Sequence, residues 1–348
     1  MTLTKTKNGV LIKGTPLRVG IIGMGKMGMI RAQVVHELPS TDLRTIADIR
    51  PEALETYSVE SFTDPYRIFD QELDMVFVCT YNHAAPDLVV TALDHGLHVF
   101  CEKPPGRSVA DVQRIREAAK RNPGCKIKFG FNHRYHYSVI EAKSMIESGR
   151  FGKILWLRGV YGKAGGIQFE NNWRSDKTKS GGGILLDQGI HMLDLLRYFI
   201  GDFTQVKSMV TTSFWKIPVE DNAFALLRTQ EGRIATLHSS STQWKHKFSL
   251  EISLEDGYIN LNGILSSTRS YGDESLTFAR KQFEDSTFAF GKPREEMIYF
   301  DRDDSWRLEV EEFVSAVRED KPVESGNLED ALKVMKLIEE IYKHSEEG

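Results

Sequence analysis

A glycine-rich turn between a predicted strand and a predicted helix constrains the fold of this chain more than any other feature. An apolar run of strand length ends at Ile22, and a segment with helical spacing covers 26–37. The glycines between them follow the pattern G-x-G-x-x-G, in which the first allows a tight turn, the second lets a phosphate approach the backbone, and the third lets helix and strand pack closely. The helix N-terminus then faces the bound anion. The pattern predicts a dinucleotide-binding turn formed by Gly23, Gly25, Lys26, Met27 and Gly28.

The first part of the chain alternates between short apolar runs and helical segments. We expect strands at 17–22, 43–48, 59–62, 74–80, 97–101 and 126–131. We expect helices at 26–37, 83–94 and 108–121. Nearly continuous apolar strands joined by single helices indicate a parallel sheet that is covered on both faces. The sequence therefore predicts a doubly wound α/β domain of Rossmann type over 15–131.

An acidic residue at the end of the second predicted strand bears on which dinucleotide binds. Asp48 lies 20 positions beyond Gly28 (48 − 28), where a carboxylate can accept hydrogen bonds from ribose hydroxyls. Arg50, two positions further on, can pair with a 2′-phosphate and offset the repulsion from Asp48. The sequence therefore favours NAD as the cofactor and leaves NADP open.

The pattern of segments changes after residue 131. Successive strand-like segments run from 203 to about 300 and are joined by Glu-Gly and Asp-Gly turns, which predicts a largely antiparallel sheet. A further strand is expected at 153–161, and helices are expected at 138–148, 185–199, 305–318 and 328–344, the last with an Asn327 cap. We expect a second, α+β domain over 132–348, whose C-terminal helices can pack back on the first domain.

A lysine follows the fifth predicted strand. Lys103 lies in a strand-to-helix loop at the carboxyl end of that strand, which is the edge of an open α/β sheet where ligands bind. Oxidation of a secondary alcohol needs a base for the hydroxyl proton and a cation or donor for the developing alkoxide, so a lysine suits this place. An ordinary surface lysine in a loop is the alternative interpretation.

A helix in the second half carries a carboxylate and an imidazole on one face. Asp187 and His191 are four positions apart, and a carboxylate one helical turn from an imidazole can orient it as a general acid or base. Asp194 lies near the same face. A histidine that is simply satisfied in the core is one alternative, and a metal site formed by these three residues is another. The sequence gives little support for a metal, and we expect none.

The composition excludes several classes of function. The net charge is -4 and lysine and arginine form no run, so we expect no nucleic-acid partner. The sequence contains no signal-peptide segment and no stretch of roughly 18 uncharged apolar residues, so we expect a cytoplasmic protein without a membrane partner. Cys79, Cys101 and Cys125 occur singly, which argues against a disulfide framework or a thiolate zinc site.

These motifs occur in an order that resembles the glucose-fructose oxidoreductase and inositol dehydrogenase (Gfo/Idh/MocA) family, and the resemblance extends over almost the whole chain. The glycine turn matches the family fingerprint, and Thr80-Tyr81-Asn82-His83 resembles its cofactor-contacting loop. Glu102-Lys103-Pro104 resembles its signature, and 181–194 resembles its glycine-rich segment and D-x-x-x-H helix. Tyr81 departs from the pattern, because many relatives have proline there.

The resemblance implies roles for particular residues. It implies that Lys103 holds the reacting oxygen, that His191 is the acid or base, and that Asp187 orients its neighbours. The segment 132–135 resembles the family's crossing between domains, and 171–174 resembles its Trp-Arg pair near the cofactor or substrate. The expected cofactor-binding residues are Gly23, Gly25, Lys26, Met27, Gly28, Asp48, Arg50, Thr80, Asn82, His83, Glu102, Lys103, Trp173 and Arg174. The expected substrate-binding residues are Lys103, Arg134, Tyr135, Tyr161, Asp187 and His191.

The resemblance also implies an activity and an assembly. We expect an NAD(P)-dependent oxidoreductase that acts on a ring hydroxyl of a sugar, an inositol or a nucleotide-linked sugar. A glycoside hydrolase or epimerase with transient oxidation, and a dinucleotide-sensing protein without catalysis, are the alternatives. The family has a large open sheet whose face forms the substrate cavity against the nicotinamide, and it forms dimers or tetramers through this sheet, so we expect a homodimer or homotetramer. Aromatic residues such as Tyr161, Trp215 and Trp244 can stack on a sugar ring, although strand aromatics usually serve the core.

Overall fold

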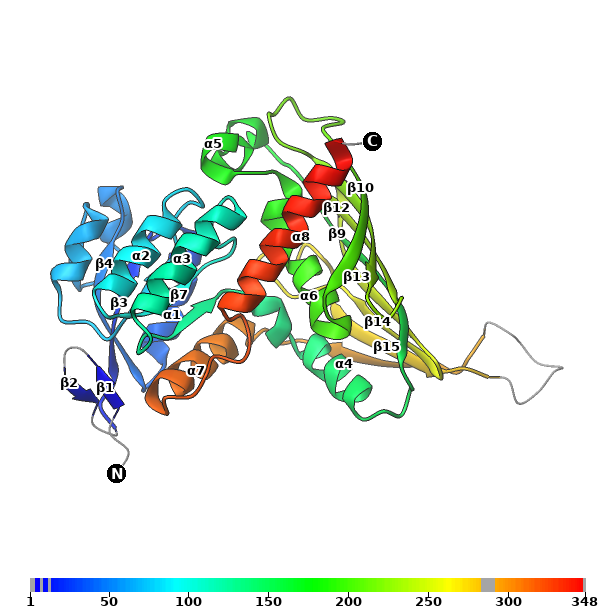
Figure 1. The fold of residues 1–348 in the computed structure, drawn as a ribbon, viewed down its shortest axis with the longest axis horizontal. Helices are drawn as coiled ribbons and strands as arrows, with labels where there is room; N and C mark the ends of the chain where they lie inside the picture. Colours follow the sequence, from blue (N-terminus) through cyan, green and yellow to red (C-terminus); the bar gives the residue numbers. More distant parts are fainter. Residues whose placement is uncertain (1–3, 7–8, 12–13, 283–291, 347–348) are drawn as a thin grey trace. The chain divides into compact units, whose positions relative to one another are not determined.

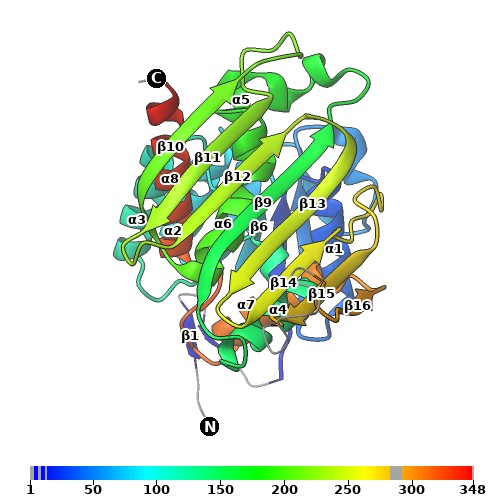
Figure 2. The same cartoon turned by 90° about the vertical axis from the view of Figure 1, so that its right-hand side faces the viewer.

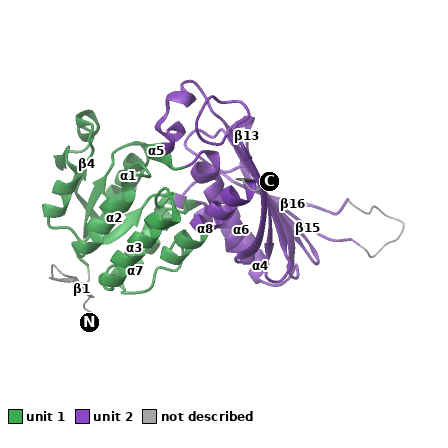
Figure 3. Ribbon diagram, turned by 45° about the horizontal axis from the view of Figure 1, so that its top comes forward, with its two compact units in different colours: residues 1–132, 178–181, 306–333 green, residues 133–177, 182–305, 334–348 purple. Residues whose placement is uncertain are grey.

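The computed structural model describes residues 4–6, 9–11, 14–282 and 292–346. The chain divides into two compact units, coloured separately in Figure 3. Unit 1 consists of residues 1–132, 178–181 and 306–333, and unit 2 consists of residues 133–177, 182–305 and 334–348. Each unit therefore takes its residues from three stretches of chain.

Unit 1 is built on a six-stranded sheet in the order β5-β4-β3-β6-β7-β8, in which neighbouring strands are parallel (Figure 1). Its strands are β3 (Leu17–Ile22), β4 (Thr41–Ala47), β5 (Glu60–Phe62), β6 (Met75–Val78), β7 (His98–Cys101) and β8 (Ile127–Phe129). The central strands β6 and β7 are buried at every position, as expected for a sheet covered on both faces. The predicted doubly wound parallel sheet is confirmed.

Four longer helices accompany this sheet in unit 1. They are α1 (Lys26–Glu37), α2 (Ala85–Asp94), α3 (Val109–Arg121) and α7 (Ser305–Arg318), with short 3-10 turns at Pro51–Leu54 and Pro65–Asp70. The core joins α7 to the sheet, because Phe313 and Val317 belong to the same buried cluster as Leu17 and Phe77. The helix at 305–318 thus packs with residues almost 300 positions earlier in the chain. A two-stranded hairpin, β1 (Thr4–Thr6) with β2 (Gly9–Leu11), precedes the sheet and was not predicted from the sequence.

Unit 2 contains an eight-stranded sheet in the order β10-β11-β12-β9-β13-β14-β15-β16. Its strands are β9 (Ile154–Ala164), β10 (Phe203–Thr211), β11 (Asn222–Thr229), β12 (Ile234–Ser240), β13 (Thr242–Leu254), β14 (Gly257–Asn262), β15 (Glu274–Arg280) and β16 (Glu296–Phe300). All neighbours are antiparallel except β12 and β9, which are parallel. The predicted, mostly antiparallel sheet is confirmed.

One face of this sheet is packed and the other is open. The helices α4 (Tyr137–Glu147) and α6 (Ile190–Ile200) lie on one face, together with a π-helical turn η6 (Leu185–Gly189), and Figure 2 shows the opposite face with no helix in front of it. The alternation of exposed and buried residues along β11 follows from this arrangement. Unit 2 also contains the short helices η3 (Asn132–Tyr135), whose first residue belongs to unit 1, η4 (Phe169–Asn171) and η5 (Trp173–Ser175). The short helix α5 (Lys177–Ser180) lies in unit 1 except for Lys177, and α8 (Leu328–Glu346) begins in unit 1 and continues in unit 2 from Val334.

The starts of α8 and α3 have side-chain caps. The Asn327 side chain accepts hydrogen bonds from the backbone N–H groups of Glu329 and Asp330, both at 3.0 Å, and so caps α8 as predicted. The Ser108 hydroxyl accepts from the backbone of Asp111 at the start of α3. None of the described helices combines the length and the apolar character that crossing a membrane requires.

Candidate active site

The glycine turn of unit 1 has the geometry that its sequence predicts. Gly23 adopts a φ of 91°, a conformation open to glycine, and a Cβ there would lie 2.6 Å from the Cys79 carbonyl oxygen. A Cβ on Gly28 would lie 1.9 Å from the Gly23 carbonyl oxygen, so only glycine lets α1 pack against the turn. Gly25 is the N-cap of α1, and a Cβ there would meet nothing closer than Arg50, at 4.0 Å.

A pocket of about 230 Å³ lies beside this turn, at the carboxyl ends of β3, β4 and β6. Six of the predicted cofactor-binding residues line it, namely Gly23, Gly25, Asp48, Arg50, Thr80 and His83. Its other lining residues include Ile49, Pro65, Tyr81 and Leu88. The remaining glycine-turn residues lie at the start of α1, where Lys26 is exposed and Met27 is half-buried. The edge of the sheet at which ligands bind in this fold class is therefore hollow in this chain.

Asp48 and Arg50 form an ion pair at this pocket. The buried carboxylate of Asp48 accepts hydrogen bonds from Arg50 Nε at 3.0 Å, from Arg50 Nη2 at 3.1 Å, and from the backbone N–H of Met24 at 2.7 Å. Burial favours a higher pKa for Asp48, but the hydrogen bonds from Arg50 and Met24 outweigh it and lower this pKa below its usual value. Asp48 is therefore ionised at neutral pH, beside a guanidinium that is about half exposed.

Three features of the pocket fit a nicotinamide dinucleotide. The open space beside Gly25 admits a pyrophosphate close to the backbone. Among the described residues, no side chain caps the N-terminus of α1 and no acidic residue lies in its first turn, so its N–H groups can receive an anion. The buried hydroxyl oxygen of Thr80 has no hydrogen-bond partner within the described residues, as expected of a group that meets a polar ligand.

The loop after β6 is tied to a distant segment of the same unit. The Asn82 amide donates a hydrogen bond to the Ser180 carbonyl at 2.7 Å, and the His83 backbone N–H donates to the Lys179 carbonyl at 3.2 Å. Asn82 is buried. Within unit 1, the predicted role of Asn82 in cofactor binding is thus accompanied by a structural one, because its amide fixes segment 178–181 beside the pocket loop.

Glu102 and Lys103 follow β7 directly. Glu102 is buried and accepts a hydrogen bond from Arg31 Nε at 2.7 Å. Lys103 is half-buried, and its peptide bond to Pro104 is cis. The predicted lysine therefore lies at the carboxyl end of the sheet, directly after a residue whose side chain is anchored in the core of unit 1.

In unit 2, Asp187 lies between two cations. Its Oδ2 is 2.7 Å from Lys163 Nζ, at the end of β9, and its Oδ1 is 3.1 Å from Arg174 Nε. Arg174 also lies over the ring of Trp173, with its guanidinium carbon 4.4 Å from the ring centroid. The sequence grouped Asp187 with Arg174 only through the family resemblance, and it gave no sign of Lys163.

His191 stacks on a second histidine. Its ring lies 3.7 Å from the ring of His133, at an interplanar angle of 18°, and both side chains are buried. His133 in turn is 3.1 Å from the hydroxyl of Tyr161, whose pKa is raised by burial. Tyr161 and His191, which were both predicted to touch substrate, therefore belong to one cluster, and His133 is the member that sequence reasoning assigned no role.

Asp194 lies three positions after His191, and its carboxylate has an arginine partner. Asp194 is buried and forms a two-point ion pair with Arg134, with Nε–Oδ2 at 2.7 Å and Nη2–Oδ1 at 2.6 Å. The Arg134 guanidinium lies over the ring of Tyr198. Tyr135 is half-buried beside it in the chain. The described part of the chain contains no group of three or more His, Cys, Asp or Glu residues that could hold a metal ion.

The π-helical turn at η6 changes how Asp187 and His191 are presented. The sequence predicts a regular helix over 185–199, but residues Leu185–Gly189 form a π turn and the α-helix begins at Ile190. Such turns widen the helix and occur often at functional sites. Asp187 thus projects from the π turn and His191 from the first turn of α6, while Lys103 belongs to unit 1.

The other candidate aromatic residues form a group of their own. The indole N–H of Trp215 donates to the Ser241 carbonyl at 3.0 Å, and Trp215 contacts both Phe214 and Trp244. Trp244 is 62% exposed. Trp244 also packs edge-on against Phe214, with the ring centroids 5.0 Å apart, so both indoles have aromatic neighbours.

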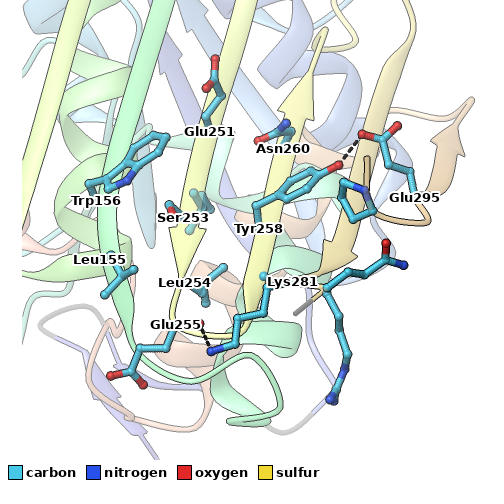
Figure 4. Close-up of a pocket in the computed structure, with 15 residues that line it drawn as sticks. Leu155, Trp156, Glu251, Ser253, Leu254, Glu255, Tyr258, Asn260, Lys281 and Glu295 are labelled. Atoms are coloured by element: carbon cyan, nitrogen blue, oxygen red, sulfur yellow. Dashed lines mark hydrogen bonds between the residues drawn. The ribbon is translucent and has the colours of Figure 1, made fainter. Parts of the chain in front are cut away.

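A larger groove lies on the open face of the unit 2 sheet. It has a volume of about 600 Å³ and is lined by side chains of β9, β13 and β14, including Trp156, Glu251 and Tyr258, and by Lys281, directly after β15 (Figure 4). None of the predicted site residues lines it. Its size alone therefore does not make it the candidate active site.

Comparison with known proteins covers both halves of the chain. Residues 17–130 match the profile described as "Oxidoreductase family, NAD-binding Rossmann fold", and residues 139–260 match that of the GFO/IDH/MocA C-terminal domain. The chain is 30% identical over 235 residues to myo-inositol 2-dehydrogenase of Thermotoga maritima, a match that covers 64% of this chain and 68% of that protein. It is 26% identical to D-glucoside 3-dehydrogenase of Escherichia coli, with 96% and 97% covered.

Solved structures share the fold. Levoglucosan dehydrogenase in complex with NADH and levoglucosan superimposes with a TM-score of 0.84 at 22% identity, covering 96% of this chain and 98% of the other. A protein from Desulfitobacterium hafniense described as an NADPH-dependent oxidoreductase has a TM-score of 0.86 at 21% identity, with 96% of each chain covered.

Proposed function

The chain belongs to the GFO/IDH/MocA family of NAD-binding oxidoreductases, and from this membership we propose that it is a dehydrogenase acting on a ring hydroxyl of a sugar, an inositol or a nucleotide-linked sugar. The observation that carries the proposal is the pocket beside the glycine turn, where the Asp48–Arg50 pair and the Thr80 hydroxyl meet the space left by Gly25. Unit 1 is then the cofactor-binding unit, and unit 2 supplies the groups for substrate.

Residues already described would hold the dinucleotide. The N–H groups at the start of α1 bind its pyrophosphate, and Asp48 accepts hydrogen bonds from the adenosine ribose. Arg50, held by Asp48, is available to a 2′-phosphate, so both NAD and NADP remain compatible with the pocket. When bound, the nicotinamide ring accepts or supplies the hydride.

The proposed chemical groups are Lys103 in unit 1 and His191 in unit 2. The ammonium of Lys103 holds the reacting oxygen and stabilises negative charge on it. His191 removes the proton from that oxygen during oxidation and returns it during reduction. Asp187 keeps Lys163 and Arg174 in place through its two ion pairs, which is how it orients its neighbours.

The test combines a substrate screen with two variants. Sugars, inositols and nucleotide-linked sugars are each mixed with NAD or NADP, and formation of the reduced cofactor is followed. On the best substrate, Lys103→Met and His191→Asn are expected to lower kcat by about 10²-fold or more, because each removes a group that acts on the proton or the charge. Lys120→Met and His36→Asn are the matched controls, since both residues are exposed on helices of unit 1.

Two results would contradict the proposal. Parental turnover in both Lys103→Met and His191→Asn would refute the catalytic assignment. Failure of calorimetry to detect binding of NAD or NADP to the parent would refute the cofactor assignment. Net accumulation of reduced cofactor over many turnovers separates a dehydrogenase from an enzyme that returns the hydride in each cycle.

We also propose that the protein is a homodimer or homotetramer formed through the open sheet face. Apolar side chains are exposed there in register, since Met209 on β10 is paired with Phe224 on β11, and Phe224 stacks on His238 of β12 at 4.0 Å. A contiguous apolar face of this kind supports a protein interface. Light scattering is expected to give two or four chains for the parent and fewer for Phe224→Asp. Ile140→Asp, at an exposed position on α4, should keep the parental mass, and a monomeric parent would contradict the proposal.

For the location, we propose the cytoplasm. Cys79 and Cys101 are thiols, and burial raises the pKa of each, so they are unreactive and suit a reducing compartment. Fractionation of the native source cells checks this assignment, and recovery of the protein outside the cytoplasm would contradict it.

A further inference from the structure

An arginine in the first helix after the glycine turn is completely buried. Arg31, on α1, has no exposed surface, and its guanidinium reaches three partners in unit 1. Nε donates to Glu102 Oε1 at 2.7 Å, Nη2 donates to Glu309 Oε2 at 2.6 Å, and Nη1 donates to the Trp306 carbonyl at 3.3 Å. One guanidinium therefore joins α1, the residue after β7, and α7.

The surroundings of this guanidinium are apolar and aromatic. It lies over the ring of Phe100, 4.3 Å from the centroid, and over the ring of Trp306, at 4.8 Å. A charge in such a place is costly unless it is paired and hydrogen-bonded. Burial favours a lower pKa for Arg31, but Glu102 and Glu309 outweigh it and raise this pKa above its usual value. Arg31 is thus a permanent charge that requires its carboxylate partners.

The two carboxylate partners of Arg31 lie in different surroundings. Burial raises the pKa of Glu309 to about 7. Near neutral pH, this carboxyl is therefore neutral in part of the molecules and charged in the others. The Glu309 Oε1 atom is buried and has no hydrogen-bond partner within the described residues, as suits a carboxyl that is poorly stabilised when charged. The Arg31–Glu102 ion pair is the part of the cluster that links α1 to the residue directly before Lys103.

The position of Glu102 is confined on several sides. Its backbone N–H donates to the Val78 carbonyl at 2.9 Å, which continues the pairing of β7 with β6. A Cβ on Gly130 would lie 2.8 Å from Glu102 Oε2 and 3.3 Å from Arg31 Nη2, so the glycine leaves room for the ion pair. The chain direction just after β7 is consequently set by a side chain that points into the core, and Lys103 is the next residue.

We propose that Arg31 is a positioning residue for Lys103, acting through its buried ion pair with Glu102. The proposal rests on the proposed function, in which Lys103 holds the reacting oxygen. Reaction rates fall steeply when a catalytic group is displaced by as little as an ångström, so the anchoring of Glu102 affects turnover more than it affects substrate binding. Arg31 itself touches neither the substrate nor the reacting atoms.

The test compares arginine and glutamate variants in the full-length enzyme. Arg31→Met is expected to lower kcat by about tenfold or more, with KM for substrate and Kd for NAD within about threefold of the parent, because the loop after β7 loses its anchor. Arg31→Lys keeps a charge that can reach Glu102 and is expected to recover part of the loss. Glu102→Gln is expected to lower kcat in the same way.

Arg18 provides a matched control. It forms a similar ion pair in the same sheet, in which Nη2 lies 3.0 Å from Asp74 Oδ1. This pair lies at the amino ends of the strands, because Arg18 is near the start of β3 and Asp74 is just before β6. Arg18→Met removes a partly buried ion pair far from the carboxyl edge of that sheet. We expect it to lower the thermal midpoint while leaving kcat at the parental value.

The outcomes separate this inference from the proposed function. If Lys103→Met keeps parental turnover, the proposed function fails, whatever the arginine variants do. If Lys103→Met is inactive but folded Arg31→Met has the parental kcat, the positioning role alone is overturned. If Arg31→Met does not fold, the decision passes to Arg31→Lys and Glu102→Gln, and a parental kcat in both overturns the inference. A loss of kcat equal to that of Arg18→Met would also overturn it.

Discussion

Replacing Glu309 by glutamine should remove part of the pH dependence of folding stability. Glu309 lies on α7 without exposed surface, and its charged form is opposed by burial and by the nearby charge of Glu102. Arg31 and Lys128 partly offset this effect, and the resulting pKa is about 7, compared with 4.5 for an ordinary glutamate. Glutamine has a similar shape and keeps an oxygen for Arg31, but it does not titrate.

The sign of the effect follows from which state holds the proton. Between pH 4.5 and about pH 7 the folded protein retains a proton on Glu309 that the unfolded chain has released. The stability that this carboxyl contributes is therefore fully present below pH 4.5 and is lost as the pH rises through about 7. The difference between 4.5 and about 7, at roughly 1.4 kcal/mol for each pH unit, corresponds to about 3 kcal/mol.

Urea unfolding at pH 5 and pH 8 measures this difference. The free energy of unfolding of the parent should fall relative to that of Glu309→Gln by about 2 to 3 kcal/mol between these two pH values, since most of the titration lies there. Glu311→Gln, which removes an ion pair with Arg307 on the exposed side of the same helix, is the matched control and should change the free energy of unfolding by less than about 1 kcal/mol. Parallel pH profiles for the parent and Glu309→Gln would refute the reasoning.

Two further predictions concern the cofactor pocket and the ion pairs of Asp187. Arg50→Ala removes the cation beside Asp48, so the Kd for NADP should rise about tenfold while the Kd for NAD changes less than about threefold, as measured by calorimetry. Equal changes in the Kd for NAD and the Kd for NADP would show that Arg50 does not bind the 2′-phosphate. Lys163→Met removes one of the two cations that pair with Asp187 and leaves the ion pair with Arg174. In steady-state assays, kcat/KM for substrate should fall about tenfold, whereas the Kd for NAD should not change. Parental kcat/KM would remove Lys163 from the substrate site.

The parallel sheet of unit 1 could be predicted because its signals are local. The predicted strand at 17–22 and helix at 26–37 coincide with β3 and α1, since an apolar run, a glycine turn and a helical pattern follow one another directly. The predicted strand at 126–131 is shorter in the structure, where β8 ends at Phe129 and a 3-10 turn begins at Asn132. Burial alone does not separate a strand end from a buried turn, so this boundary was not visible in the sequence.

The order of strands in unit 2 could not be predicted. β9 is first in the chain but lies between β12 and β13, parallel to the former and antiparallel to the latter. Alternation along each strand predicts that it has one buried face, but it does not say which strand is its neighbour. The π turn at Leu185–Gly189 was hidden for a related reason, because no residue of its sequence, Leu-Leu-Asp-Gln-Gly, distinguishes a π turn from a turn of regular α-helix.

The residues of the candidate site divide according to how far away their partners lie. The glycines of the turn act on their own backbone, and Asp48 meets Arg50 two positions away, so their pattern is readable within one segment. Arg31 shows why the rest was hidden. An arginine on a helix is expected to be exposed, and nothing near it in the chain indicates otherwise, because its two carboxylate partners lie 71 and 278 positions away. A buried charge is tolerated only where the fold brings compensating charges to it from distant segments. Such partners become visible only in the folded structure. The structure therefore reveals what the sequence hides most completely, namely a buried ion pair next to a predicted catalytic residue. For the Arg31–Glu102 pair, measurements of kcat in the Arg31 and Glu102 variants test whether it matters for turnover.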